Sequence, residues 1–187
     1  MSLKARWIDF LYRVATGSRK VRNLFTPIGA TVFAFITFLF IAVALQMDKL
    51  FNFPGLLPTP VNVIVALPVL LSGFFMMGWS FLNFLKVKGT PVPFNPPPRL
   101  VTSGPYAYVR NPMLTGLFML LFGLGALLQS ISLVVLFTPA FIAFNVWELK
   151  AIEEPELEKR LGEEYIRYKN MTPMFFPDFR KKSGKNV

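Results

Sequence analysis

Two stretches of the chain, Phe25–Met47 and Val61–Leu85, contain no Lys, Arg, Asp or Glu. Each meets the roughly 20 consecutive apolar residues that a helix needs to cross the hydrocarbon core of a bilayer. The chain as a whole is 53% hydrophobic and only 16% charged, which is too apolar for a typical soluble domain of 187 residues. The pattern predicts an all-α integral membrane protein with two transmembrane helices within residues 25–85.

A third uncharged stretch covers residues 111–147 and is too long for one helix. Its middle carries Gln129, Ser130 and Ser132, polar residues at which a tight turn is expected. We therefore predict a transmembrane hairpin over residues 113–147. Its two helices, of about 16 residues each, are slightly short for a hydrocarbon core of roughly 30 Å. The predicted total is four transmembrane helices.

Residues 1–24 predict a helix that lies in the membrane interface rather than across the bilayer. Apolar residues recur there at helical spacing, while charged residues take the other faces. The simplest role for such a helix is an anchor, and the alternatives are a gate or a lipid contact. The apolar positions are Leu3, Trp7, Phe10, Leu11 and Val14.

Positive charge is distributed unevenly among the predicted loops. Six Lys or Arg residues precede Phe25, four lie within residues 86–110 and nine follow from Lys150 onward, whereas Lys49 stands alone on the other side. Because cytoplasmic loops are enriched in these residues, we predict a multi-pass protein with both termini cytoplasmic. The net charge of +10 also favours contact with anionic membrane lipids. No basic soluble module is present, so nucleic-acid binding is not expected.

Residues 86–98 connect the second predicted span to the third and contain five prolines. Prolines prevent a helix from continuing and favour an extended chain, so we predict a strap over the cytoplasmic surface. Such a strap either covers a site or simply connects two spans. The prolines are Pro91, Pro93, Pro96, Pro97 and Pro98.

The chain contains no Cys and no His. Thiol chemistry is therefore excluded, and the commonest metal ligand and the usual general base at neutral pH are both missing. We expect no metal site. The first long apolar run begins at Phe25 and is a full span rather than a short signal core, so no cleavable signal is predicted.

The strap leads into a polar turn, VTSGPYAYVRNPMLTG, at residues 101–116, directly before the predicted hairpin. Glu153 and Glu154 follow the hairpin, so the two polar segments return to the same membrane surface. A predicted cap at that surface combines the strap, this turn and a helix from Pro155 to about Met171. Together with the hairpin, the cap forms a catalytic region over residues 86–187.

The turn segment GPYAYVRNPMLTG resembles the GxYxxxRHPxYxG signature of membrane methyltransferases related to isoprenylcysteine carboxyl methyltransferase and phospholipid N-methyltransferases. Residues 153–177 resemble the EExxL, FGxxYxxY and proline-rich ending of the same family. Two motifs separated by a hydrophobic hairpin are far more specific than either motif alone. Asn111 and Leu114 stand where the signature has His and Tyr.

The resemblance implies a methyltransferase that uses S-adenosyl-L-methionine. It implies that Glu153 accepts the ammonium of the cofactor, that Leu100 and Val101 enclose its adenine, and that Tyr106 offers a ring edge or hydroxyl. The residues matched to the cofactor-binding positions of the family are Arg99, Leu100, Val101, Tyr106, Asn111, Pro112, Met113, Leu114 and Glu153.

Three residues are predicted to act in catalysis: Arg110, Asn111 and Glu154. The fork geometry of Arg110 suits bidentate pairing, so we expect it to bind either the cofactor carboxylate or Glu154. Methyl transfer from a sulfonium needs alignment and desolvation more than proton transfer, and a site without His is therefore competent.

The predicted acceptor is a lipophilic small molecule or a lipid that arrives from the bilayer. Prenylcysteine methyltransferases place an Arg four residues before the first Glu, where it meets the acceptor carboxylate, and this chain has Leu149 there. We therefore expect Leu149 to line the acceptor site. The alternatives are a prenylated-cysteine methyltransferase and an NADPH-dependent sterol-type reductase, which shares a similar arginine-proline turn. A transporter or scaffold is disfavoured because no ionisable residue lies within the four predicted spans.

Overall fold

The computed structural model describes residues 3–87, 90 and 92–177, and these contain helices but no strand. The predicted all-α fold is thus confirmed. In chain order the elements are the helices α1 (Leu3–Ala15), α2 (Arg19–Leu50) and α3 (Val61–Lys86), the 3₁₀ turn η1 (Gly104–Ala107), helix α4 (Pro112–Leu127), the π-helical turn η2 (Ser132–Phe137), helix α5 (Thr138–Glu148), the π-helical turn η3 (Leu149–Glu153), and helices α6 (Glu154–Leu161) and α7 (Glu163–Met171).

Three continuous helices in the described part of the chain are long and apolar enough to cross a membrane: Arg19–Leu50, Val61–Lys86 and Ser132–Leu161. The first two contain the two spans predicted within residues 25–85. The fourth apolar helix, α4, has only 16 residues, or about 24 Å at 1.5 Å per residue. It is therefore shorter than the hydrocarbon core, as the sequence predicted for this half of the hairpin.

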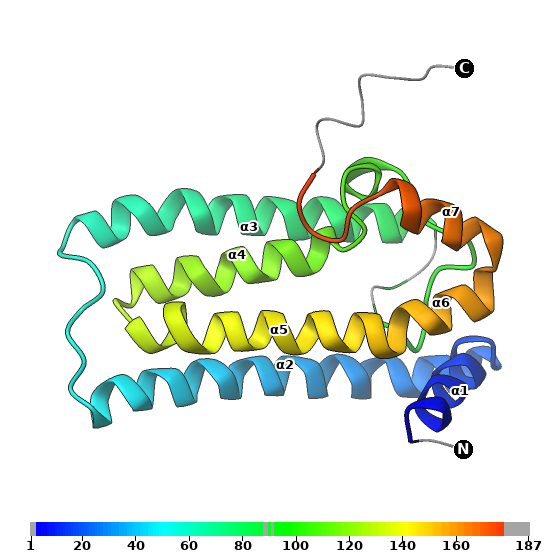
Figure 1. Ribbon diagram of the computed structural model, residues 1–187, viewed down its shortest axis with the longest axis horizontal. Helices are drawn as coiled ribbons and strands as arrows, with labels where there is room; N and C mark the ends of the chain where they lie inside the picture. Colours follow the sequence, from blue (N-terminus) through cyan, green and yellow to red (C-terminus); the bar gives the residue numbers. More distant parts are fainter. Residues whose placement is uncertain (1–2, 88–89, 91, 178–187) are drawn as a thin grey trace.

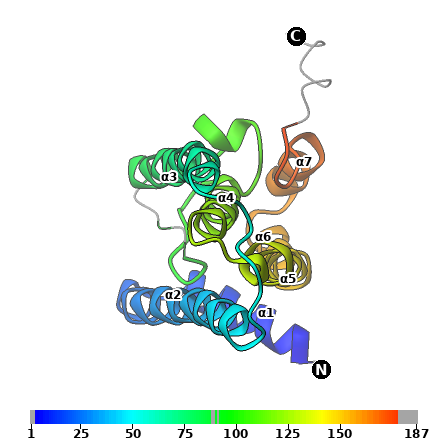
Figure 2. The ribbon, with the colours of Figure 1, turned by 90° about the vertical axis from the view of Figure 1, so that its left-hand side faces the viewer.

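Helices α2, α3, α4 and α5 run side by side, and α4 occupies the middle of the bundle (Figures 1 and 2). The connection from α2 to α3 and the turn after α4 lie at one end. Helices α1, α6 and α7 gather with the connection from α3 to α4 at the other end (Figure 1). This second end is called the cap end below, and it contains both sequence motifs.

Helices α3 and α4 pack closely because glycines face each other between them. A Cβ added at Gly73 would stand 2.8 Å from the Gly116 carbonyl oxygen, and one at Gly116 would stand 2.8 Å from the Gly73 oxygen. Only residues without side chains permit such an approach, which is a common way for membrane helices to associate. The contact holds the start of α4, and with it the turn before it, against α3.

The end opposite the cap is closed by a polar turn at the position predicted for the hairpin. Gln129 adopts a φ of 58° there and accepts a hydrogen bond from the Leu56 N–H at 3.2 Å. The Asp48 carboxylate accepts hydrogen bonds from the Ser130 hydroxyl and, at 3.0 Å, from the Ser132 N–H. These contacts tie the turn to the end of α2 and to the connection that follows it.

The second half of the predicted hairpin does not end at residue 147. The helix continues through η3 and α6 to Leu161, so α6 prolongs the last span. The predicted single cap helix from Pro155 to Met171 is correspondingly wrong, because Gly162, with a φ of 58°, separates α6 from α7. Each π-helical turn ends two residues before a proline, Pro139 or Pro155, and this wider turn accommodates a ring that would clash in a regular α-helix.

Helix α1 packs against the cap rather than standing apart as an isolated anchor. Its Leu11 and Val14 are buried, and its Asp9 forms an ion pair of 2.6 Å with Lys159 of α6. The Lys159 ammonium also lies 4.6 Å from the centre of the Tyr12 ring. The N-terminal helix is therefore fastened to α6 at the cap end.

Candidate active site

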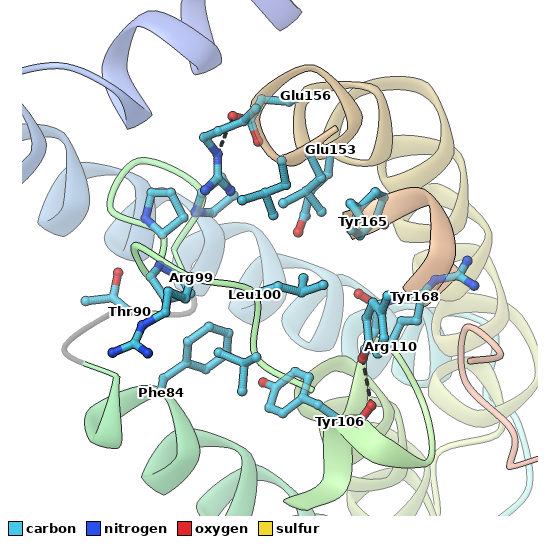
Figure 3. Close-up of a pocket in the computed structure, with 18 of the residues that line it drawn as sticks. Phe84, Thr90, Arg99, Leu100, Tyr106, Arg110, Glu153, Glu156, Tyr165 and Tyr168 are labelled. Carbon is cyan, nitrogen blue, oxygen red and sulfur yellow. Dashed lines mark hydrogen bonds and ion pairs between the residues drawn. The ribbon is translucent and has the colours of Figure 1, made fainter. Parts of the chain in front are cut away.

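A pocket of about 710 Å³, including its open mouth, lies at the cap end between α3, the strap, η1, α6 and α7. Figure 3 shows Glu153 and Tyr165 on one side of Leu100 and Phe84 and Tyr106 on the other. The lining residues are Phe84, Thr90, Val92, Pro93, Pro96, Pro97, Arg99, Leu100, Val101, Tyr106, Arg110, Asn111, Glu153, Glu156, Leu157, Arg160, Leu161, Tyr165 and Tyr168.

The strap forms one wall of this pocket and is anchored on its far side by Phe94. The Phe94 ring lies 5.8 Å from the Phe25 ring and 6.3 Å from the Phe10 ring, measured between centroids. A Cβ added at Gly29 of α2 would stand 2.5 Å from the Phe94 ring. Phe94 thus fills a notch made by α1 and α2. The predicted Pro91 lies outside the described residues.

The turn before α4 places Tyr106 against the pocket. Gly104 begins η1 with a φ of 61°, and a Cβ there would meet the Asn83 side chain at 2.7 Å, so glycine is required. The Tyr106 ring packs edge-on against Phe84, with centroids 5.3 Å apart. Its backbone carbonyl accepts a hydrogen bond of 2.7 Å from the Tyr168 hydroxyl. The two motif segments therefore contact each other directly.

The pKa values of Tyr106, Tyr165 and Tyr168 are all raised, chiefly because burial disfavours the phenolate. Their hydroxyls consequently remain protonated across the pH range in which the protein would be used. They serve as hydrogen-bond donors and acceptors, and none is a proton acceptor in the form of a phenolate.

Arg110 lies at the pocket wall, but its guanidinium binds the protein itself. Its Nη2 donates to Glu154 Oε1 at 2.7 Å, and its Nη1 donates to the carbonyls of Lys169 and Thr172 at 2.8 and 2.6 Å. The Arg110 N–H donates to the Pro173 carbonyl at 2.8 Å. The predicted pairing of Arg110 with Glu154 is present, and it fastens the chain after α7 to the turn before α4.

Glu154 is buried and forms an ion pair with Lys169 as well as with Arg110. Its Oε2 lies 2.7 Å from Lys169 Nζ, which also approaches Glu158 Oε1 at 2.9 Å. These hydrogen bonds raise the pKa of Lys169 above its ordinary value. Both carboxylate oxygens of Glu154 are therefore engaged, and this side chain does not line the pocket.

One face of the continuous helix formed by η3 and α6 supplies charged side chains to the pocket. Glu156, Leu157 and Arg160 lie three, four and seven residues after Glu153, so all four share a helix face. Arg160 Nε donates to Glu156 Oε1 at 2.8 Å, and both side chains are largely buried. The Glu153 carboxylate has no hydrogen bond or ion pair to any residue that the structure describes. Figure 3 shows it directed toward the interior of the pocket.

Six of the nine residues matched to cofactor positions line this pocket, namely Arg99, Leu100, Val101, Tyr106, Asn111 and Glu153. Pro112, Met113 and Leu114 do not line it: Pro112 is fully buried, and Leu114 packs against the core around Phe118 and Phe141. Leu149, the predicted acceptor residue, is 2% exposed in η3 and also lies outside the lining.

Twelve lining residues are not among the predicted site residues, and four of them have ionisable side chains: Glu156, Arg160, Tyr165 and Tyr168. The two tyrosines are buried residues of α7 that form part of the pocket wall. The available signal was the helical spacing from Glu153 to Glu156 and Arg160. This spacing places the three residues on one face only if the helix continues past Glu153. The sequence pattern instead predicts that a new helix begins at Pro155, so the shared face was not recognised.

The lining combines apolar side chains with an unpaired carboxylate. Leaving a charged group in a partly buried apolar site without a partner is unfavourable. The pocket therefore fits a ligand that brings a cation to Glu153 and an apolar or aromatic part to Leu100, Val101 and Phe84.

Comparison with known proteins places this geometry in a family. A segment of 78 residues is 36% identical to the nickel-cobalt-cadmium resistance protein NccN of Alcaligenes xylosoxydans xylosoxydans, over 42% of this chain and 36% of that protein. The match thus spans only about a third of the length of NccN. Residues 61–164, which are more than half of the chain and include α3, the turn before α4 and the Glu153–Glu154 pair, match the phospholipid methyltransferase family. With both of its motifs assembled around one pocket beside apolar helices, this chain belongs to the phospholipid methyltransferase family.

Proposed function

We propose that this protein is an S-adenosyl-L-methionine-dependent methyltransferase that acts at the cytoplasmic face of the membrane on a lipophilic small molecule or lipid. The observation that carries the proposal is the pocket at the cap end, which joins the residues around Tyr106 to Glu153 of the second motif. Membership of the phospholipid methyltransferase family supports the reaction class and the lipid nature of the acceptor.

The chemistry of the lining suits this cofactor, which carries an ammonium, a carboxylate, a sulfonium and an adenine ring. Glu153 is the unpaired carboxylate that would accept the ammonium. Leu100 and Val101 offer apolar surface to the adenine, and the protonated hydroxyl of Tyr106 offers a hydrogen bond. When bound, the cofactor supplies a methyl group activated by the positive sulfur.

The protein contributes alignment and exclusion of water. Arg110 and Glu154 fix the chain after α7 against the turn before α4, so the two motif segments stay at a constant separation. The strap, anchored by Phe94, covers one side of the pocket. Holding two reactants in line in a desolvated site is the main requirement of a displacement at a methyl group.

The cap end carries most of the basic residues, which favours its placement at the cytoplasmic side, with four spans and both termini on that side. Anionic lipids would be attracted to the same face. A soluble cofactor then arrives from the cytosol, and the acceptor arrives from the bilayer beside the helices.

The decisive measurement is ligand-dependent stability of the purified protein. S-adenosylhomocysteine, the demethylated product, should stabilise it by about 2.7 kcal/mol at a hundredfold excess over the dissociation constant. NADPH should cause no shift in the unfolding temperature. Stabilisation by NADPH alone would contradict the proposal and favour the sterol-type reductase.

The acceptor class needs a second experiment. Protein incubated with methyl-labelled cofactor and fractionated lipid extract should label a lipid fraction, and a farnesylcysteine analogue should remain unlabelled. Turnover of the farnesylcysteine analogue without activity on lipid would instead identify a prenylated-cysteine acceptor.

A further inference from the structure

The pocket contains three arginines, and they differ in what their guanidinium groups are free to bind. Arg110 is committed to Glu154 and to two backbone carbonyls. Arg99 is exposed, and Figure 3 shows its side chain directed away from Glu153. Arg160 is largely buried, with 12% of its side chain exposed, and only its Nε is bound, to Glu156. Its Nη1 and Nη2 make no hydrogen bond or ion pair to a described residue.

Arg160 is also held in a defined direction. Helical side chains lean toward the N-terminus of their helix, and the 2.8 Å bond from Nε to Glu156, one turn earlier, fixes that lean. Arg160 and Glu153 both line the pocket and lie two helical turns apart, on one face of the helix.

This arrangement places a free carboxylate and a partly free guanidinium on one helix face in one pocket. We propose that Arg160 is an oxyanion-binding residue of the pocket and holds the α-carboxylate of an amino-acid ligand whose ammonium binds Glu153. Glu156 is the positioning residue that orients Arg160. The inference rests on the proposed function, because the ligand with both groups is the methionine part of the proposed cofactor.

The geometry of arginine makes the double role of Arg160 feasible. A guanidinium has five N–H donors in a planar fork, so Nε can serve Glu156 while the Nη groups face a ligand. A phosphate would be recognised by the same chemistry, and a phospholipid headgroup is therefore the competing source of the oxyanion. The presence of a partner for an ammonium and a partner for a carboxylate in one pocket favours the zwitterionic amino-acid ligand.

The test compares two soluble ligands that differ only in the amino-acid part. S-adenosylhomocysteine carries the carboxylate and ammonium, whereas 5′-methylthioadenosine retains the thioether and adenosine and lacks both. We expect Arg160→Gln to weaken S-adenosylhomocysteine binding by about 10- to 100-fold, the scale of a charge-assisted hydrogen bond. Binding of 5′-methylthioadenosine should stay within about twofold of the unaltered protein, which also shows that the variant is folded.

Matched variants separate a specific effect from a general one. Lys159→Gln removes a neighbouring charge on the same helix that does not line the pocket, and it should change neither affinity. Arg160→Lys keeps the charge and should recover part of the lost affinity. Glu156→Gln should weaken S-adenosylhomocysteine binding by a smaller factor than Arg160→Gln and leave 5′-methylthioadenosine binding unchanged.

Each contrary result has a definite meaning. Equal losses for both ligands in Arg160→Gln would show that Arg160 only shapes the pocket, and no loss for either would show that the carboxylate binds elsewhere. If Arg160→Gln loses affinity for glycerophosphoethanolamine and not for S-adenosylhomocysteine, the residue binds phosphate and the proposal is overturned. Absence of S-adenosylhomocysteine binding to the unaltered protein would overturn the proposed function itself.

Discussion

At the residue scale, the unpaired carboxylate of Glu153 gives the most direct test of the site. We expect Glu153→Gln to weaken S-adenosylhomocysteine binding by roughly 1.5 to 3 kcal/mol, because a hydrogen bond to a charged group is lost. Titration calorimetry of the purified protein measures this change. Glu163, exposed at the start of α7, is the matched control, and Glu163→Gln should have little effect. Equal effects at the two positions would show that Glu153 is not the ammonium partner.

The neighbouring Glu154 differs from Glu153 in its surroundings, and its removal should act on stability. Its side chain is 5% exposed and holds both Arg110 and Lys169. Glu154→Leu leaves a buried guanidinium without its carboxylate and should destabilise the protein by about 3 to 5 kcal/mol, measured by denaturation in detergent. The double variant Arg110→Met with Glu154→Leu should recover part of that loss. A Glu154→Gln protein of unchanged stability and lost turnover would instead support the catalytic role predicted from sequence.

At the scale of elements, the strap depends on the notch that receives Phe94. Gly29→Leu would place side-chain atoms where the Phe94 ring lies, because even a Cβ would stand 2.5 Å from it. We expect the strap to detach, so that proteolysis near residues 92–97 accelerates and affinity for S-adenosylhomocysteine falls severalfold. Gly78→Leu on α3 is the control, since a Cβ there meets nothing within 4 Å. Unchanged proteolysis in Gly29→Leu would show that Phe94 does not anchor the strap.

The elements also show where sequence reasoning succeeds and where it fails. Charge-free stretches locate α2, α3 and α4, because the bilayer imposes a simple length and composition rule, and the polar residues from Gln129 to Ser132 locate the turn. The same rule fails beyond residue 147, since a helix leaving the bilayer need not end there. Pro155 marks no helix start, because the preceding π-helical turn accommodates it.

The residues of the candidate site also fall into those that the sequence predicts and those that it does not. Residues next to the family motifs, such as Tyr106 and Glu153, could be predicted because the motif itself specifies them. Glu156 and Arg160 could not be predicted, because they reach the pocket only if the helix continues without a break from η3 into α6. The roles of Arg110 and Glu154 as structural partners follow from contacts with residues 169–173, which no local pattern indicates.

At the scale of the whole molecule, both motifs, α1 and the strap lie at one end of the bundle, and the predicted orientation places that end in the cytoplasm (Figure 1). The natural chain contains no Cys, so single cysteines report on topology without background. Ser18 and Glu164 are exposed at the cap end, and Phe53 is exposed at the other end. The three test variants are therefore Ser18→Cys, Glu164→Cys and Phe53→Cys. In intact cells a membrane-impermeant maleimide should label Phe53→Cys, and it should label the other two only after permeabilisation.

Labelling of Ser18→Cys and Glu164→Cys in intact cells would reverse the orientation and place the pocket on the outer face, where a cytosolic cofactor could not reach it. Labelling of one of these two without the other would contradict the arrangement of α1 beside α6 at a common membrane face.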